Sequence, residues 1–415
     1  MTLARNPGDE RTEAAGWPWS HRKTFLERLA AQGYAAVTIQ EYRTVSGRFC
    51  DIIEKRGFQI GDLDGAATER LRHAVLSGVT GSTRSYAKHC ARRFIDHLIE
   101  AGAASPAPTQ TKKLTPLDRL RDEYQGYLRK QRGLAESTVY HATRFMERFL
   151  VFRFGDKLGD LNAITPDQIV AFLCHLKAGS HPRRQKALPS HLRNLFKFLF
   201  WSGKTKRDLA QSLPRVATAS DNLPRYLKPE EIQRLIQSVR AGDSIGRRNY
   251  AMLLLMARLG LRAPEVIAIQ LDDIDWRVGE ILIRGKGKLH DRMPLPADVG
   301  EAIVDYLKNG RAGNSRTLFV SAKPPHPPFK NAQILNTLLC DAFERTGLKP
   351  PQKYVGSHLF RHSLATDMLR KGASLDEIGD VLRHRARMTT TIYAKYDINA
   401  LRSIARQWPV GGDAR

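Results

Sequence analysis

The sequence predicts a multidomain protein in which two all-α helical modules precede a mixed α/β domain, mainly helical with a small antiparallel sheet. Two segments, 103–113 and 213–224, are rich in small residues and proline and lack apolar periodicity, which is typical of linkers. The stretches before the second linker carry apolar residues at helical spacing, and the stretch after it adds a strand–turn–strand pattern. The expected parts are residues 18–102, 114–212 and 223–410.

The first two parts resemble each other in sequence. Residues 33–38 correspond to 133–138, each beginning with glycine and ending with threonine. Residues 92–102 correspond to 193–203, each an apolar helical pattern that ends at a glycine. Shared helix patterning alone accounts for some of this likeness, but the order of the matches favours a duplicated module of about four helices.

Aromatic and aliphatic stripes in the second module have helical spacing and are expected to form its core rather than to stack on bases. The stripes are Tyr124, Tyr127 and Leu128; Phe145, Phe149 and Phe152; and Phe196, Leu199 and Phe200.

The four cysteines lie in apolar, helix-like surroundings without metal-ligand spacing, which predicts buried, reduced thiols. They are Cys50, Cys90, Cys174 and Cys340.

Local signals place the elements of the third part. A proline followed by two acids opens a helix at 229–231, and a second helix runs over 249–258. Alternating residues around a Gly/Lys turn predict a hairpin from 280–284 and 292–295. Residues 374–377 form a capping box that opens a helix running to Leu382.

The charge balance points to a polyanionic partner. The chain has 67 Lys and Arg against 42 Asp and Glu, a net charge of +25. Basic side chains release counterions when they neutralise phosphates, so nucleic acid is the favoured partner, although a charged helix face is often only solvated. The candidate DNA-binding residues are Arg84, Lys88, Arg92, Arg129, Lys130, Arg132, Arg183, Arg184, Lys186 and Lys288.

We expect a cytoplasmic protein associated with the bacterial nucleoid and not with a membrane. The segment 1–17 is polar and lacks the apolar stretch of a signal peptide. The longest apolar run, 251–257, is too short to cross a bilayer.

Several residues in the third part have the chemistry that phosphodiester transfer requires. Arginine binds two phosphate oxygens through its fork and keeps its proton, which suits Arg262 and Arg361. Glu265, one turn after Arg262, is placed to hold that arginine. Lys286 lies between two glycines at the hairpin tip and suits a mobile proton donor, with Lys288 as a competitor on the same face.

Histidines and a tyrosine follow in the same part. His358 lies three residues before Arg361, so both can face one phosphate, whereas His362 points elsewhere as a core or hydrogen-bonding histidine. His384 follows the capped helix, and Tyr393 lies in a short helical pattern as the candidate nucleophile. Tyr354 and Tyr396 are the alternatives to Tyr393.

This ordered set resembles the tyrosine recombinase (phage integrase) family over about 223–410, and 114–212 resembles its core-binding, SAM-like domain. The motifs are Gly-Leu-Arg-x-x-Glu, the Gly-Lys-Gly hairpin, His-x-x-Arg-His, and a histidine and tyrosine nine residues apart. The resemblance implies that Tyr393 attacks a phosphate and forms a 3′-phosphotyrosyl bond, without metal, ATP or another cofactor. It also implies roles for the remaining residues: Arg262 and Arg361 clamp the phosphate, Lys286 protonates the leaving 5′-oxygen, His358 acts as acid or base, and His384 bonds the phosphate.

The resemblance further implies partners. Family members act on specific sites in double-stranded DNA, as a homotetramer that exchanges strands through a Holliday junction, and the free chain would be a monomer or weak oligomer. Accessory proteins are also possible partners.

The sequence departs from the family pattern in two places. Arg383 stands where glycine is usual before the histidine, which implies either a different turn or an added phosphate contact. The additional module at 18–102 implies a longer DNA footprint or a protein–protein surface. We therefore expect a recombinase of a mobile element. A type IB topoisomerase and a non-catalytic DNA-binding accessory protein are the alternatives, and a metal-dependent nuclease is disfavoured because no acidic triad stands out.

Overall fold

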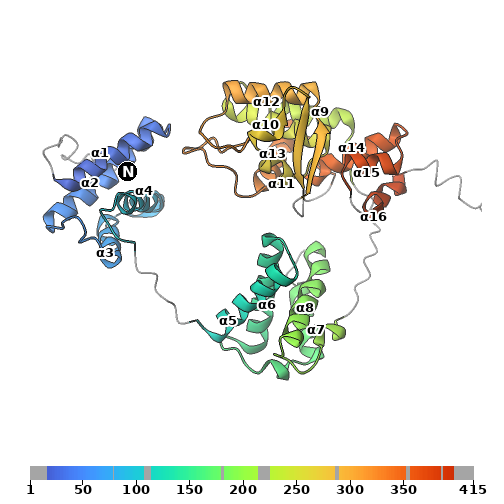
Figure 1. The fold of residues 1–415 in the computed structure, drawn as a ribbon, viewed down its shortest axis with the longest axis horizontal. Helices are drawn as coiled ribbons and strands as arrows, with labels where there is room; N and C mark the ends of the chain where they lie inside the picture. Colours follow the sequence, from blue (N-terminus) through green and yellow to red (C-terminus); the bar gives the residue numbers. More distant parts are fainter. Residues whose placement is uncertain are drawn as a thin grey trace, which may run out of the picture. The chain divides into compact units, whose positions relative to one another are not determined.

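The structure is a computed structural model that describes residues 16–77, 79–106, 114–178, 182–213, 225–285, 289–351, 356–384 and 387–396. Helices dominate its three parts, which are coloured along the chain in Figure 1. Each part is built around its own group of buried apolar side chains, as the linker pattern suggests. No helix among the described residues is long and apolar enough to span a bilayer.

The first module consists of four helices around one core. Asp64 caps the third helix, because its side chain accepts a hydrogen bond from the amide of Ala67 at 2.6 Å. Phe25, Phe49 and Phe94 pack edge-on or tilted against one another at the centre. The helices are α1 (Trp17–Ala31), α2 (Ala36–Lys55), α3 (Gly65–Val75) and α4 (Gly81–Glu100).

The second module also has four main helices, and its first helix continues into a π-helical turn. Thr115 and Asp118 form a capping box in which each side chain accepts the other's backbone amide at 3.1 Å. The elements are α5 (Pro116–Gly126), η2 (Tyr127–Gln131), α6 (Glu136–Phe154), η3 (Leu161–Ala163), α7 (Pro166–Ala178), α8 (Pro182–Trp201) and η4 (Leu209–Ser212).

The aromatic stripes form the core of this module with two exceptions. Phe149 and Phe196 are fully buried and meet edge to face, as predicted. Phe152 and Phe200 are 42% and 39% exposed, so the expectation that they are core residues was wrong. Helical spacing places both residues on an apolar face but does not determine how completely other side chains cover them, and Phe152 meets α7 through the rings of Phe172 and His175.

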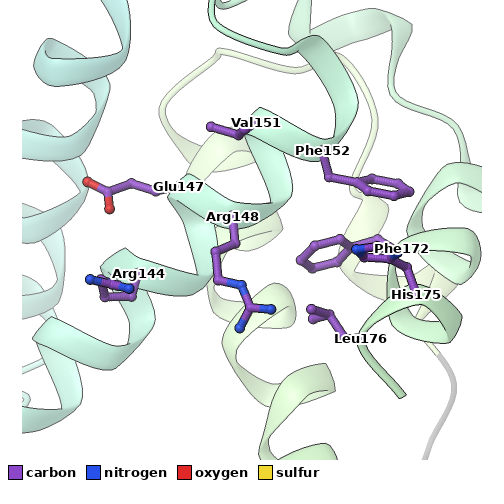
Figure 2. Close-up of a pocket in the computed structure, with 8 residues that line it drawn as sticks. All are labelled: Arg144, Glu147, Arg148, Val151, Phe152, Phe172, His175 and Leu176. Atoms are coloured by element: carbon purple, nitrogen blue, oxygen red, sulfur yellow. The ribbon is translucent and has the colours of Figure 1, made fainter. Parts of the chain in front are cut away.

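Phe152 instead borders an open groove between α6 and α7. Figure 2 shows Phe152, Phe172 and His175 on one side of this groove and Arg144 and Arg148 on the other. The groove therefore joins an aromatic wall to a basic rim.

The prediction of four buried thiols was half right. Cys50 and Cys90 are buried in the first module, whereas Cys174 and Cys340 are exposed. Both exposed cysteines lie on helices with many apolar residues. Apolar neighbours in the sequence did not show whether the cysteine itself is on the buried or the exposed face of its helix.

The third part is built around one buried helix, and it also contains a three-stranded sheet. Helix α10 begins at the Asp243 cap and buries every residue from Ala251 to Ala257, because α9, α11, α12 and α14 all pack on it. The longest apolar run of the chain is thus an internal helix. The first elements of the third part are α9 (Pro229–Ser238), α10 (Ser244–Leu259), α11 (Ala263–Ala268) and η5 (Leu271–Asp273).

The sheet is antiparallel in the order β1–β2–β3. The predicted hairpin is confirmed as β2 (Glu280–Gly285) and β3 (Leu289–Pro294), with Ile281 opposite Met293. The two-residue strand β1 (Ile274–Asp275) was not predicted, since a strand this short has no detectable alternation.

The C-terminal helices carry most of the candidate site. The predicted capping box is present, with the amide of Glu377 donating to Ser374 Oγ at 3.2 Å. A second, smaller core joins Ala365, Ile378, Leu382 and Tyr393. The helices after the sheet are α12 (Ala297–Asn309), α13 (Gln333–Thr346), α14 (His358–Arg370), α15 (Leu375–Val381), α16 (Arg387–Thr390) and η6 (Thr391–Tyr396).

Candidate active site

Arg262 is held where α10 gives way to α11. Its own backbone amide donates to Glu265 at 2.8 Å, and its guanidinium donates to the other oxygen of the same carboxylate at 2.7 Å. The predicted pairing of Arg262 with Glu265 is therefore present. The carboxylate is buried, while about a third of the Arg262 side chain remains exposed. Glu265 thus fixes the arginine and leaves part of it available to an anion.

A second arginine shares that carboxylate. Arg383 Nη2 donates to Glu265 Oε2 at 2.8 Å, and Arg383 Nε lies 4.0 Å from Asp291 on β3. Arg383 adopts a left-handed backbone with φ of 54°, so the turn that glycine would favour is kept. Its buried side chain faces Glu265. The partner of this arginine lies 118 residues away in sequence, and sequence reasoning missed the pair.

Burial alone would raise the pKa of Glu265. Hydrogen bonds from the Arg262 backbone and side chain, and then the charge of Arg383, outweigh that effect and lower the pKa below its ordinary value. The carboxylate is therefore charged throughout the neutral range, and it balances two nearby guanidinium groups.

Arg361 lies deep in the site and is 3% exposed. Its guanidinium donates to the carbonyl of Gly260 at 2.7 Å and also to the carbonyl of Leu382. Burial, followed by the charges of Arg262 and Arg383, lowers its pKa to about 10, so it remains protonated at neutral pH. The two carbonyls fix one arginine against two separate segments of the chain.

Gly260 makes this close approach possible. It ends α10 in a left-handed conformation with φ of 58°, which glycine adopts without strain. A Cβ atom at this position would lie 2.7 Å from Leu382 and 3.1 Å from Leu364. Any larger residue would be strained at this φ and would displace the Leu382 and Leu364 side chains beside Arg361.

His358 is the first residue of α14 and remains exposed on one side. Partial desolvation, followed by the charges of Arg262 and Arg361, lowers its pKa below the ordinary value. His358 is therefore neutral at physiological pH, with a ring nitrogen able to accept a proton.

The Tyr393 hydroxyl lies inside the site. It shares a hydrogen bond of 2.9 Å with His362 Nδ1, and the two rings meet edge to face. Tyr393 is 1% exposed and belongs to the small core under α14 and α15. His362 forms a hydrogen bond as predicted, but the expectation that it points away from the site was wrong, because its bonding partner is the candidate nucleophile.

His384 stacks on Tyr393 with nearly parallel rings, whose centroids are 6.4 Å apart. Its Nδ1 shares a hydrogen bond of 2.8 Å with Thr390 Oγ1, a buried hydroxyl that sequence reasoning overlooked. Burial, followed by the charges of Arg361 and Arg262, lowers the pKa of His384 to about 4. This histidine is therefore neutral, and Thr390 fixes its orientation.

Lys286 and Lys288 lie outside the described residues, between Gly285 and Leu289 of the hairpin. Tyr354 also lies outside them, as does the Tyr396 side chain.

The base of the hairpin is anchored. Arg284 donates to both oxygens of the buried Asp273 at 3.0 and 2.6 Å, which ties β2 to η5.

The candidate DNA-binding residues divide into three groups. Arg129 pairs with Glu136 at 2.8 Å, whereas Lys130 and Arg132 are exposed beside it at the end of η2. Arg183, Arg184 and Lys186 lie in α8, but their side chains are outside the described residues. Arg84, Lys88 and Arg92 are exposed along α4 of the first module.

Across the described ranges, no group of three or more His, Cys, Asp or Glu side chains is arranged to hold a metal ion. The chemistry of the site instead comes from two guanidinium groups, two neutral histidines and a phenol. Arg262 and Arg361 attract an anion, His358 and His384 offer neutral nitrogens beside it, and Tyr393 supplies a hydroxyl. An oxyanion with a nearby electrophilic centre fits this arrangement.

Two segments of the chain match known protein families. Residues 225–399 match the phage integrase family, and residues 122–203 match the N-terminal SAM-like domain of phage integrases. The chain is 35% identical over 388 residues to the putative integrase/recombinase y4rA of Sinorhizobium fredii, covering 93% of each protein. It is 29% identical over 305 residues to the tyrosine recombinase XerD of Mycobacterium tuberculosis, covering 68% of this chain and 95% of that relative.

A solved structure has the same fold. The lambda integrase tetramer bound to a Holliday junction matches with a TM-score of 0.52 and 17% identity, over 80% of this chain and 91% of that one.

Proposed function

This chain belongs to the phage integrase family of tyrosine recombinases, and we propose that the cluster around Tyr393 is its active site. The protein is accordingly a site-specific DNA recombinase, an enzyme that cuts and rejoins DNA strands. The observation that carries the assignment of the site is that the Tyr393 hydroxyl, two neutral histidines and two arginines gather in one cluster of the third part.

Arg262 and Arg361 bind the scissile phosphate. Their side chains come from different segments and are each held by fixed partners, Glu265 for one and backbone carbonyls for the other. Two preoriented cations stabilise the extra negative charge that develops on phosphorus during attack. Because guanidinium groups keep their proton in proteins, this binding of the phosphate does not depend on a proton being gained or lost.

Tyr393 is the nucleophile. Its oxygen attacks phosphorus, the bond from phosphorus to the 5′-oxygen breaks, and the products are a 3′-phosphotyrosine and a free 5′-hydroxyl. The phenolic proton passes to a neutral base, and we assign this role to His358. Lys286 supplies the proton that the leaving 5′-oxygen takes up. The neutral His384 donates a hydrogen bond to a phosphate oxygen.

The buried position of Tyr393 requires a movement before attack. A hydroxyl that is hydrogen-bonded to His362 on a 1% exposed side chain cannot reach a DNA phosphate in this arrangement. We infer that DNA binding shifts the η6 segment and breaks that hydrogen bond. Activity is thereby coupled to the presence of substrate.

The partner is double-stranded DNA carrying specific recombination sites. Support comes from the net charge of +25 and from the lambda integrase tetramer solved on a Holliday junction. We extend that assembly to this chain as a homotetramer on DNA, acting in the cytoplasm on the bacterial chromosome. The likeness to the putative integrase/recombinase y4rA supports a role for a mobile element.

The test is recombination of a supercoiled plasmid that carries two copies of the DNA bordering the protein's own gene, with EDTA present. We expect recombinant circles from the native protein and none from Tyr393→Phe. Relaxation without exchange would contradict the proposal in favour of a topoisomerase. Binding without cleavage on every substrate would contradict it in favour of an accessory protein.

A further inference from the structure

The first module, which no family match covers, has the same architecture as the module at residues 114–213. Both contain four main helices in the same order and of similar length. The family match covers residues 122–203 of the later module. The corresponding pairs are α1 with α5 and η2, α2 with α6, α3 with α7, and α4 with α8.

The entry into the second helix is the same in both modules. Ala35 and Ala135 precede it with φ and ψ of −63° and 147°, and of −64° and 147°, respectively. The amide of Ile39 donates to the Ala35 carbonyl at 2.9 Å, and that of Val139 donates to the Ala135 carbonyl at 3.0 Å. The two modules therefore begin their second helix with the same backbone geometry.

The exit from the last helix repeats as well. After α4 the amide of Ala103 donates to the carbonyl of Leu98 at 2.8 Å, and after α8 the amide of Lys204 donates to the carbonyl of Leu199 at 2.8 Å. The next amide donates to the same carbonyl at 3.2 Å in each case. A glycine with positive φ lies inside both turns. Helices commonly end in this way at a glycine, and α1 does so too, through the amide of Tyr34 and the carbonyl of Leu29. Duplication of the module is therefore supported by the matching order and lengths of the helices and by the shared entry into the second helix.

Part of the core corresponds between the two modules. Side chains at matching places in the two modules are buried in both, although their identities mostly differ. The matching buried pairs are Phe49 and Phe149, Cys50 and Leu150, Leu63 and Ile164, Phe94 and Leu195, and Leu98 and Leu199.

We propose that residues 16–106 form a second SAM-like module that binds duplex DNA beyond the segment held by the rest of the protein. The binding surface is the basic face of α4 formed by Arg84, Lys88 and Arg92, which we call the α4 basic face. This inference rests on the proposed function, because it extends the same DNA partner to a further module.

The α4 basic face differs from other cations of the first module. Its residues recur every four positions, so they lie along one side of the helix, and all three are exposed. Two other arginines of the first module instead form ion pairs, Arg28 with Glu100 and Arg72 with Glu69.

One acid does approach the face, but it contributes little. Arg92 lies 3.9 Å from Asp96, and both side chains are largely exposed. Such a surface pair is worth less than about 1 kcal/mol, so a DNA phosphate can replace the aspartate.

The length of the face fits a DNA backbone. With a rise of 1.5 Å per residue, Arg84 and Arg92 are separated by about 12 Å along the helix. Phosphates of one DNA strand are spaced about 3.4 Å along the duplex axis, so the face spans three to four of them, roughly one for each cation. These contacts hold the backbone and carry no base specificity by themselves.

The experiment uses the full chain on DNA that extends well beyond the core site on both sides. Hydroxyl-radical footprints compare the native protein with the double variant Arg84→Ala/Lys88→Ala. The matched control is Lys55→Ala/Arg56→Ala, which removes two exposed cations at the C-terminal end of α2. Helix α2 contacts α4 near its other end, where the ring of Tyr42 meets that of Tyr86. Circular dichroism confirms that the variants remain folded.

We expect the Arg84→Ala/Lys88→Ala variant to lose protection at the outer edge of the footprint and to keep protection of the core site. The slope of log affinity against log salt falls by about two in that variant, one for each lost phosphate contact. The control keeps the native footprint and slope.

Two outcomes would overturn the inference. One is an unchanged footprint and salt slope in Arg84→Ala/Lys88→Ala. The other is an unchanged footprint together with lost self-association in sedimentation, which would make the face a protein-binding surface. Failure of the proposed function is distinguishable, because the native protein would then protect no core site at all.

Discussion

At the residue scale, one buried carboxylate organises the site. Glu265 accepts hydrogen bonds from Arg262 and from Arg383, and both arginines lie near Arg361. A single acid thus sets the spacing of the positive charges that meet the phosphate. If either arginine is removed, the buried negative charge of Glu265 loses one of its two cationic partners.

The first prediction concerns Arg383→Gly, which installs the residue usual in the family. Glycine fits the positive φ, but the buried Glu265 loses one partner, which costs about 3 kcal/mol, partly offset by about 1 kcal/mol from relief at the left-handed position. We expect a net loss of about 2 kcal/mol in urea unfolding, and a lower rate of strand cleavage at unchanged DNA affinity.

The matched control for this prediction is Lys371→Ala, which removes an exposed ion pair with Asp367. It should cost less than about 1 kcal/mol. Equal stability losses in the two variants would show that the pair between Arg383 and Glu265 does not organise the site.

The second prediction concerns acid stability. His384 has a folded pKa of about 4, against 6.5 for an unperturbed histidine. Below pH 6.5 the unfolded chain binds a proton that the folded chain excludes, so this stability is present above pH 6.5 and is lost as pH falls towards 4. His358, whose pKa is also lowered, acts in the same direction.

The measurement is the free energy of unfolding between pH 7 and pH 4.5. We expect the native protein to lose on the order of 1 kcal/mol more than His384→Gln over this range, since the variant cannot titrate there and solvent screens part of the effect at the half-buried ring. Parallel curves for the two proteins would contradict the buried, neutral state of His384.

Residue order was enough to predict Arg262, Glu265, Arg361 and Tyr393 as site residues, because their motifs are local. It was not enough for the bond between His362 and Tyr393, or for the pair between Arg383 and Glu265. These contacts join residues 31 and 118 positions apart, and only the packing of α11, α14 and η6 brings them together.

At the element scale, the hairpin depends on an anchor below its tip. Arg284 ties β2 to the buried Asp273, which also caps η5 through the amide of Gln270 at 2.8 Å. The element that carries Lys286 is thereby fixed at its base to the main core. This anchor supports the two strands on either side of residues 286–288.

The third prediction tests that anchor with Arg284→Ala. Loss of two charge-assisted hydrogen bonds leaves Asp273 buried and less well compensated, at a cost of about 2 to 3 kcal/mol. We expect faster hydrogen exchange of the β2 amides by mass spectrometry and a slower cleavage step.

Arg292→Ala on β3 is the control for this prediction, because that arginine forms only a loose surface pair with Glu280 at 3.6 Å. Unchanged exchange in Arg284→Ala, or equal acceleration in both variants, would contradict the anchoring role.

Sequence patterns predicted the elements with strong local signals. Proline and acids marked α9, a capping box marked α15, and alternation marked the hairpin. They did not predict the exposure of Phe152 and Cys174, because periodicity identifies a helix face but not what covers it.

At the scale of the whole molecule, the two helical modules of similar architecture and the net charge of +25 favour extended contact with DNA. The linkers and the repeated motifs were visible in the sequence. The agreement of the turn geometries between the modules emerged only from the structure.

The fourth prediction is a steep salt dependence of DNA binding. A chain with a net charge of +25 that neutralises about six to ten phosphates should lose roughly a thousandfold or more in affinity between 50 and 200 mM salt. Fluorescence anisotropy titrations with a labelled duplex measure this directly. A nearly flat response would contradict a DNA-binding role for the basic surface.

Covalent trapping tests the central claim most directly. The protein is mixed with nicked duplexes from the borders of its own gene in the presence of EDTA, and denaturing gels compare it with Tyr393→Phe and with the control Tyr396→Phe. We predict a protein–DNA adduct through a 3′-phosphate, mapped to Tyr393 by mass spectrometry, which is retained in Tyr396→Phe and absent in Tyr393→Phe. An adduct that persists in Tyr393→Phe, or bound DNA without any adduct, would contradict the assignment of this site.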